Sequence, residues 1–348
     1  MTRLPVLDLR EFDDAAARAG FLARLRSAAR DVGFFYLVGH GVDAALAPEI
    51  FALSRRFFAL PEADKLAIQM ANSPHFRGYT RLGDERTAGR TDWREQLDVG
   101  LEVPALKLSD GDPPWKRLQG PNQWPAALPE LRPALLRWHA EVFPVASRVL
   151  RAFALALEQP EDVFDEACAG IPNQVVKTIR YPGRDTAASD QGCGAHKDSE
   201  FVTLLYQHEI GGLQVWSDGE GDAGGSGEGD WIDAPPLPGS FVVNAGELLE
   251  LASDGYLRAT LHRVVAPPAG SERLSLAFFL AARLDAAVPL LQLPAHLAAE
   301  ARGPARDPSN PLYREVGLNT LKGRLRSHPD VARRHYADLL APVVGASP

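Results

Sequence analysis

Two short runs of this sequence contain residue types that bind a metal ion together. His196 and Asp198 stand two positions apart within residues 194–199, and side chains two apart on an extended strand point to the same face. One imidazole and one carboxylate would then face a common point, and His262 is the best candidate for a third ligand. Two histidines and one carboxylate on one face of a metal leave about three coordination positions open. The three residues therefore predict a metal site that can hold further ligands.

The identity of the metal follows from this ligand set. Zinc usually takes a closed tetrahedral set, or a third nitrogen or sulfur, whereas an open set with one carboxylate is typical of non-haem Fe(II) sites that hold a co-substrate and O2 together. A lone His-x-Asp is a weak signal in a chain with nine histidines. The combination with a later His-Arg-Val run and an Arg-x-Ser run, each in a strand-like context, is much rarer.

Arg273 and Ser275 form a candidate clamp for a carboxylate. Arg273 follows His262 by eleven residues, and Ser275 lies two further on, so both side chains are expected on the inner face of one strand. A planar guanidinium beside a hydroxyl can hold a carboxylate through paired, charge-assisted hydrogen bonds.

Several segments have the order and spacing of one known family. They are residues 4–9, 31–41, 180–182, 194–198, 211–215, 244–247 and 262–264. In these segments, which extend over most of its length, the chain resembles the isopenicillin N synthase-like group of Fe(II)/2-oxoglutarate-dependent oxygenases. The resemblance implies a double-stranded β-helix, a variant of the jelly roll.

The resemblance also implies the cofactors and the reaction. His196, Asp198 and His262 would be the iron ligands, with 2-oxoglutarate and O2 as co-substrates. The expected reaction hydroxylates a small-molecule substrate, or desaturates or cyclises it, and releases succinate and CO2. Hydroxylation is the default outcome.

By the same resemblance, Arg273 and Ser275 bind the distal carboxylate of 2-oxoglutarate. Tyr181, which precedes a proline, has two interpretations. It adds a hydroxyl near the co-substrate, or it packs at a strand end.

Two alternatives remain open at this point. An oxidase of the isopenicillin N synthase type would use the same Arg-x-Ser pair to hold a substrate carboxylate and would need no 2-oxoglutarate. A non-catalytic binding module on the same fold is the second alternative. The complete ligand set argues against the second, because buried His and Asp side chains without a metal carry a cost.

The amino-acid composition limits the classes of partner and the cellular location that we expect. The 348 residues include 37 basic and 45 acidic side chains, a formal charge of −8, and no long basic run, so a nucleic acid is not expected as a partner. No stretch of about 18 apolar residues occurs that would span a membrane. The only cysteines, Cys168 and Cys193, form no pairing pattern, which favours a reducing cytoplasm. The oligomeric state stays open.

The first half of the chain predicts helices around short strands. Strands are expected at residues 6–9 and 34–38, with a helix between them and two more helices at about 42–58 and after Pro61. A long amphipathic helix over 128–158, with a kink at Pro144, is expected to support a sheet. Residues 73–120 lack clear periodicity and predict loops or short hairpins outside the core. Within them, Tyr79 and Trp93 either contact substrate or pack the loop.

The second half switches to short β-like runs. They lie at residues 174–180, 201–206, 213–216, 241–244, 261–265 and 274–280, a spacing typical of a sandwich or barrel. The fold class is therefore α+β with a mainly β core, flanked by N-terminal helices and the long supporting helix. The chain is expected to divide at about residues 120, 170 and 290, into an N-terminal region (1–120), the supporting helix (121–170), the core (171–290) and an extension (291–348).

Two segments have no assigned chemistry. The glycine-rich, acidic residues 217–230 predict a flexible surface loop that either is dispensable or covers the site. The extension ends in a helix expected near 331–340, and it either covers the barrel mouth or pairs subunits.

Overall fold

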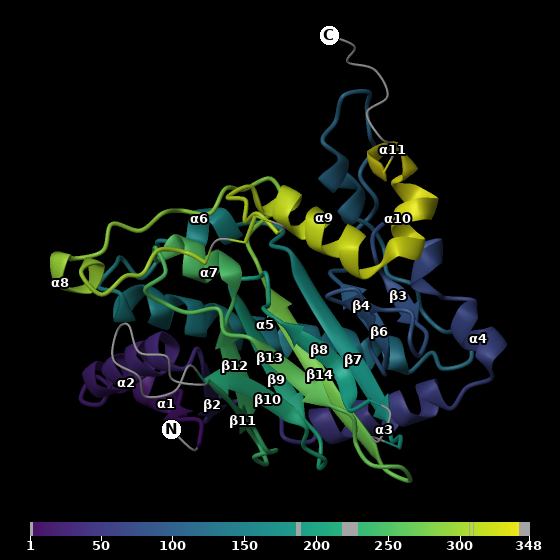
Figure 1. The fold of residues 1–348 in the computed structure, drawn as a ribbon, viewed down its shortest axis with the longest axis horizontal. Helices are drawn as coiled ribbons and strands as arrows, with labels where there is room; N and C mark the ends of the chain where they lie inside the picture. The colour runs from purple at the N-terminus through teal and green to yellow at the C-terminus, as the bar shows by residue number, and fades with distance from the viewer. Residues whose placement is uncertain (1–2, 186–188, 218–228, 306, 309, 341–348) are drawn as a thin grey trace.

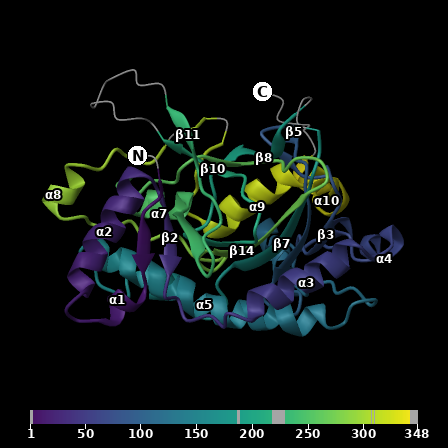
Figure 2. The same ribbon diagram turned by 90° about the horizontal axis from the view of Figure 1, so that it is seen from below.

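The computed structural model describes residues 3–185, 189–217, 229–305, 307–308 and 310–340. Most of the expected glycine-rich loop, residues 218–228, lies outside the described residues. Figure 1 shows two sheets with helices on the outside, and Figure 2 shows the same layers from below. Within the described ranges, no helix combines the length and the apolar character needed to cross a bilayer.

The described strands form one large sheet, one small sheet and a separate pair, β4 with β5, and almost all of their pairings are antiparallel. The large sheet has eight strands in the order β1-β2-β12-β9-β14-β7-β6-β3, and the small sheet has four in the order β11-β10-β13-β8. The strands are β1 (Val6–Asp8), β2 (Phe34–Val38), β3 (Gly78–Thr80), β4 (Arg86–Thr87), β5 (Arg90–Thr91), β6 (Glu95–Gly100), β7 (Gln174–Pro182), β8 (Gln191–His196), β9 (Val202–Gln207), β10 (Leu213–Ser217), β11 (Asp230–Asp233), β12 (Phe241–Ala245), β13 (His262–Val265) and β14 (Glu272–Leu280).

The helices lie around these sheets. They are α1 (Arg10–Asp13), α2 (Arg18–Asp31), α3 (Leu46–Phe58), α4 (Glu62–Leu66), α5 (Leu131–Ala156), α6 (Asp165–Cys168), α7 (Glu247–Ala252), α8 (Ala295–Ala298), α9 (Val316–Ser327), α10 (Pro329–His335) and α11 (Ala337–Leu340), with two 3-10 turns, η1 (Met70–Asn72) and η2 (Pro114–Leu118).

The two sheets face each other across an apolar layer, as expected for the double-stranded β-helix. Val215 and Val264 from the small sheet pack in one buried cluster with Val242 and Ala277 from the large sheet. A second, larger cluster fills the space between the large sheet and the helices. Burial of these side chains on both faces of the large sheet is the main driving force that holds the layers together.

The supporting helix α5 is as the sequence predicts. Its apolar stripe, which includes the fully buried Trp138 and Phe153, packs against β9 and β14. Figure 2 shows α5 running under the large sheet beside α3. Pro144 lies inside the helix.

The prediction for residues 73–120 was wrong in one important part. β6 is buried along its whole length and pairs with β7 and β3, so it belongs to the core sheet. Its sequence contains Glu95, Gln96 and Asp98, which hide the strand from a hydrophobicity pattern. The two carboxylates are compensated inside the protein, since Glu95 pairs with Lys65 and Asp98 pairs with Arg324.

The C-terminal extension covers the mouth of the barrel. Helix α9, which the sequence analysis did not predict, lies across one end of the strands in Figure 1 and packs on η2. The helix expected near 331–340 is present as α10 and α11, with Tyr336 between them.

Candidate active site

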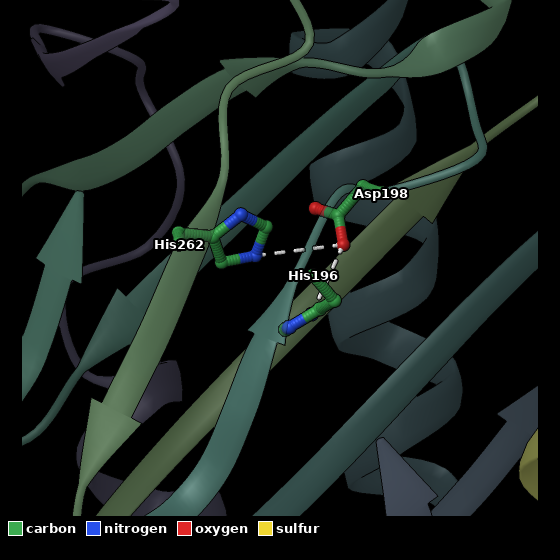
Figure 3. Close-up of side chains that lie close together, drawn as sticks. All are labelled: His196, Asp198 and His262. Atoms are coloured by element: carbon green, nitrogen blue, oxygen red, sulfur yellow. Dashed lines mark ion pairs between the residues drawn. The ribbon is translucent and has the colours of Figure 1, made fainter. Parts of the chain in front are cut away.

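His196, Asp198 and His262 meet at one point inside the barrel. His196 ends β8, Asp198 follows in the next loop, and His262 begins β13, where it pairs directly with His196. The Nε2 atoms of both histidines lie 3.6 Å from Oδ1 of Asp198, and Figure 3 shows the three side chains converging. One ligand atom from each residue lies within 4.8 Å of the others. Strand pairing, rather than spacing alone, therefore builds the triad.

Backbone carbonyls fix the orientation of both imidazoles. Nδ1 of His196 lies 2.9 Å from the carbonyl oxygen of Gly194, and Nδ1 of His262 lies 3.2 Å from that of Thr260. A proton on each Nδ1 leaves Nε2 with a free lone pair directed to the shared point. This is the tautomer that a metal ligand needs.

The Asp198 carboxylate is held from its other side. Its Oδ2 accepts hydrogen bonds from Thr203 Oγ1 at 2.6 Å and from Asn244 Nδ2 at 2.9 Å, which leaves Oδ1 for the centre of the triad. Burial alone would raise the pKa of Asp198, but the charges of His262 and His196 and these two hydrogen bonds hold that pKa below its ordinary value. The carboxylate is therefore ionised and oriented.

When no metal is bound, the pKa of one imidazole is lowered and the pKa of the other is raised. Burial and the charge of His196 lower the pKa of His262 to about 4. Burial also opposes protonation of His196, but Cys193 and Asp198 outweigh it and raise the pKa of His196 to about 10. The site thus keeps one positive charge near Asp198, in the place where a divalent cation would replace the proton. The donor set fits such a cation.

Arg273 and Ser275 lie next to each other on β14, deep in the barrel, as the sequence predicts. Arg273 is completely buried; its Nη1 donates to Ser275 Oγ at 3.2 Å and its Nη2 to Gln207 Oε1 at 2.9 Å. Its Nε has no partner among the described residues. A buried guanidinium without a carboxylate partner is suited to bind the carboxylate of a ligand.

Tyr181 also lies at this clamp. It pairs with Arg273 across β7 and β14, and the guanidinium carbon of Arg273 lies 4.9 Å from the centre of its ring. Tyr181 is buried, so its ring fixes the plane of the guanidinium.

A cavity of about 60 Å³ connects the clamp and the triad. Its wall includes all six of the predicted site residues, together with apolar side chains such as Leu205 and Val242. The six predicted residues therefore come from four strands and one loop that the fold brings to one cavity.

A wider cleft of about 350 Å³ opens from the triad toward α9. Its walls are strongly charged. They include Arg94, Lys177, Lys197, Glu200, Glu247, Lys322, Arg324 and Arg326. Such a surface suits a polar ligand more than an apolar one.

Tyr79 and Trp93 do not line this cleft. Tyr79 is buried against Phe57 and donates to Glu95 at 2.6 Å. Trp93 donates to the carbonyl oxygen of Pro182 at 3.1 Å. In this structure, both side chains have packing roles.

Sequence reasoning missed three residues that orient the site. Thr203 and Asn244 hold Asp198, and Gln207 holds Arg273. Asn244 stood inside a segment of the family resemblance but without a role. Gln207 and Thr203 have no sequence signal, because strand pairing alone brings them to the site.

Two family models match the chain. The model described as the non-haem dioxygenase in morphine synthesis N-terminal domain matches residues 4–127, and that of the 2OG-Fe(II) oxygenase superfamily matches residues 172–282. The chain is 33% identical over 358 residues to a 2-oxoglutarate-dependent dioxygenase, frbJ, of Dothideomycetidae sp. (strain 11243), covering 98% of this chain and 94% of the relative. It is 34% identical over 304 residues to a homoarginine-6-hydroxylase of Arabidopsis thaliana, covering 83% and 88%.

Solved structures agree with this relationship. A putative 2OG-Fe(II) oxygenase family protein from Caulobacter crescentus has a TM-score of 0.72 at 26% identity, covering 92% of this chain and 99% of that one. JOX2, solved in complex with 2OG, Fe and JA, has a TM-score of 0.71 at 27% identity, covering 96% and 89%.

The fold and the site define a non-haem iron oxygenase, and the chain belongs to the Fe(II)/2-oxoglutarate-dependent oxygenase family. It is an oxidoreductase that uses Fe(II), 2-oxoglutarate and O2 and acts on a small molecule. The named relatives are 2-oxoglutarate-dependent, which disfavours both the oxidase and the non-catalytic alternative.

Proposed function

We propose that His196, Asp198 and His262 hold the Fe(II). Both free Nε2 atoms and Asp198 Oδ1 face one point, and this convergence carries the assignment. When bound, the iron supplies O2 activation coupled to oxidative decarboxylation of 2-oxoglutarate to succinate and CO2. The residues around it position the reactants and exclude water.

Arg273, Ser275 and Gln207 hold the distal carboxylate of 2-oxoglutarate in this proposal. The complete burial of Arg273 excludes water from the pair and strengthens the charge-assisted hydrogen bonds. The ring of Tyr181 packs against the guanidinium of Arg273 and fixes its plane.

Alanine substitutions test the metal ligands. H196A, D198A and H262A should each abolish turnover and sharply weaken Fe(II) binding measured by calorimetry, with an unchanged circular dichroism spectrum. H296A, at an exposed histidine of α8, is the matched control and should behave as the wild type. Retained Fe(II) binding in any one of the three variants would remove that residue from the ligand set.

We also propose that the substrate is a small molecule with a cationic group and a carboxylate, of the kind that amino acids with a basic side chain provide. The carrying observation is a pair of carboxylates in the cleft near Asp198. Burial raises the pKa of the Glu247 carboxyl to about 7, although Lys322 and Lys197 oppose this shift. Burial, with the nearby Asp198, also raises the pKa of Glu200. A guanidinium or ammonium group between them would restore the interactions that both carboxylates lose on burial.

The nearby lysines do not neutralise Glu247. Lys197 forms its ion pair with Glu250 at 3.3 Å, and Lys322 donates to the Pro311 carbonyl and to Asn319. No cation among the described residues lies within ion-pair distance of Glu247. At the rim, Arg86 and Arg326 line the cleft and form no ion pair with a described residue, so they are available to a substrate carboxylate.

Relatives support this substrate class. Homologues in Arabidopsis thaliana, Glycine max and Oryza sativa are named homoarginine-6-hydroxylases, and homoarginine carries both a guanidinium and a carboxylate. The charged walls of the cleft support the same class without reference to those names.

A substrate panel tests the proposal. Homoarginine, arginine and lysine should stimulate succinate formation, whereas glutamate, norleucine and thymine should not. E247Q should raise the KM for the cationic substrate at least tenfold while leaving 2-oxoglutarate binding unchanged, and E247D should recover part of the loss. Stimulation by an uncharged compound alone, with none from the cationic ones, would overturn this substrate class without affecting the iron assignment.

We further propose a cytoplasmic location and no nucleic-acid partner. The low cysteine content and the net charge of −8 support both. Cell fractionation and a DNA-binding assay at low salt test these two points.

A further inference from the structure

A second cavity, separate from the catalytic cleft, lies beyond the end of β6 and β7. It has a volume of about 420 Å³ and is walled by the segment around Leu101, by Trp115 of η2, by Ile171 and by Leu284, which follows β14. Arg77 and Gln174 also line it, whereas none of its lining residues is shared with the triad or the clamp. Its size is within the range of pockets that take small molecules.

Arg77 is the unusual residue of this cavity. It is 7% exposed, and its Nε has no hydrogen-bond partner among the residues that the structure describes. The one hydrogen bond that its side chain makes to a described residue runs from Nη1 to the carbonyl oxygen of Phe76, at the long distance of 3.4 Å. Among the described residues, no carboxylate lies within ion-pair distance of its guanidinium. A buried cation without a partner is costly.

Asp98, the carboxylate whose charge acts on Arg77, is already occupied by other donors. Oδ1 of Asp98 accepts from Gln96 at 2.8 Å. Oδ2 of Asp98 accepts from Arg324 at 2.9 Å and lies 3.5 Å from Lys177. Burial, reinforced by the charge of Arg324, lowers the pKa of Arg77 to about 10 even though Asp98 opposes the shift. Arg77 thus stays cationic at neutral pH with its charge uncompensated.

The backbone holds the guanidinium in this position. It lies against Gly100, where an added Cβ would come within 2.4 Å of Arg77 Nε. Gly100 pairs with Val175, so the guanidinium sits at the same strand end as Gln174. The side chain of Gln174 is 4% exposed, and its Oε1, a hydrogen-bond acceptor, has no partner in the described part of the chain.

The other charged groups of the wall are compensated. Arg283 binds Asp285 at 2.9 Å, and Lys116 binds Asp112 at 2.5 Å. The wall therefore presents one uncompensated positive charge, and the remaining surface is largely apolar.

We propose that this cavity binds a small molecule with one anionic head group on an apolar body. The head group pairs with the Arg77 guanidinium, and the body packs against Leu101, Trp115 and Leu284. A carboxylate or a phosphate meets this requirement, because both accept the paired hydrogen bonds of a guanidinium. The ligand replaces the ion pair that Arg77 lacks within the chain.

Calorimetry on the full chain tests the proposal. The protein is first loaded with Mn(II) and 2-oxoglutarate, so that the clamp at Arg273 is occupied. Octanoate and octyl phosphate are the probes, and octanol and octylammonium are the neutral and cationic controls. One equivalent of at least one anionic probe should bind at least tenfold more tightly than either control. Comparison of the affinities of octanoate and octyl phosphate shows which head group the cavity prefers.

Substitutions locate the binding. R77Q should weaken binding of the anionic probe at least tenfold, and R77K should recover part of it. Ile171 is an exposed wall residue, so I171E should also weaken binding while I171K should not. L290E, at an equally exposed leucine outside the cavity, is the matched control. Equal affinity of octanol and octanoate, or wild-type affinity in I171E, overturns the proposal even where R77Q fails to fold.

Discussion

The completely buried guanidinium of Arg273 sets the affinity for the co-substrate. Lysine keeps the charge but loses the planar pair of donors that reach Ser275 and Gln207. We expect R273K to weaken 2-oxoglutarate binding by about 2–4 kcal/mol, with Fe(II) binding little changed. Titration of 2-oxoglutarate into the Mn(II)-loaded protein measures the difference.

The matched control for this prediction is R180K. Arg180 stands on β7, half-buried and paired with Glu95 and Glu272, but it does not line the cavity. Its substitution should leave 2-oxoglutarate affinity within error of the wild type. Equal losses in the two variants would mean that stability, and not carboxylate binding, accounts for the R273K effect.

Asn244 controls the metal through Asp198. Without its amide, Asp198 Oδ2 keeps only the hydrogen bond from Thr203, and the carboxylate can rotate. We expect N244A to lower Fe(II) affinity by about 10–100-fold, since residues that orient metal ligands typically have effects of this size. Competition with a chelator measures it, and N72A, at an asparagine of η1 remote from the site, should show no loss.

The sequence shows the residues that touch ligands and hides those that orient them. His196, Asp198, Arg273 and Ser275 are readable because their types are rare in apolar strands and their spacing has a chemical meaning. Gln207 is different: its position opposite Ser275 comes from the register of two strands that no local pattern reports.

At the scale of elements, α5 contains a titrating group within the core. His139 is buried against Phe278, and its Nε2 has no hydrogen-bond partner within the described ranges. Burial and the charge of Arg77 lower its pKa from 6.5 to about 4. The unfolded chain therefore takes up a proton first as the pH falls below 6.5, and stability is lost progressively down to about pH 4.

The variant H139L removes this titration. Between pH 7 and pH 5, the wild type should lose about 2 kcal/mol more free energy of unfolding than H139L does. Urea denaturation at the two pH values gives the difference. Parallel losses in both proteins would show that other groups determine the acid sensitivity.

Elements with a clear apolar pattern were predicted well, and the failures have physical causes. β2, α5, β9 and β14 follow directly from their apolar spacing. The extent of β8 was not predicted. The sequence indicated an extended backbone only at His196 and Asp198, because residues 191–195 are small or polar and the pairing with β13 makes them extended. β6 was misassigned because its polar residues are neutralised only by partners distant in sequence.

At the scale of the molecule, the N-terminal region and the core form one sheet. β1, β2, β3 and β6 occupy both sides of the strands that carry the clamp. Asp98 of β6 is fully buried. It forms ion pairs with Lys177 on β7 and with Arg324 on α9. One carboxylate thus connects the N-terminal region, the core and the helix over the cleft.

Arg324 is the link by which α9 stays over the cleft. In R324A, Asp98 keeps Gln96 and the more distant Lys177 but loses its closest cation, and breaking a buried ion pair typically costs about 3–5 kcal/mol. Because Lys177 remains, we expect a loss of about 3 kcal/mol in the free energy of unfolding. The KM for the substrate should rise as well, because α9 forms a wall of the cleft, whereas 2-oxoglutarate binding at Arg273 should be unaffected. R333A, at an exposed arginine of α10, is the control, and an R324A protein with wild-type stability and KM would contradict the role assigned to this ion pair.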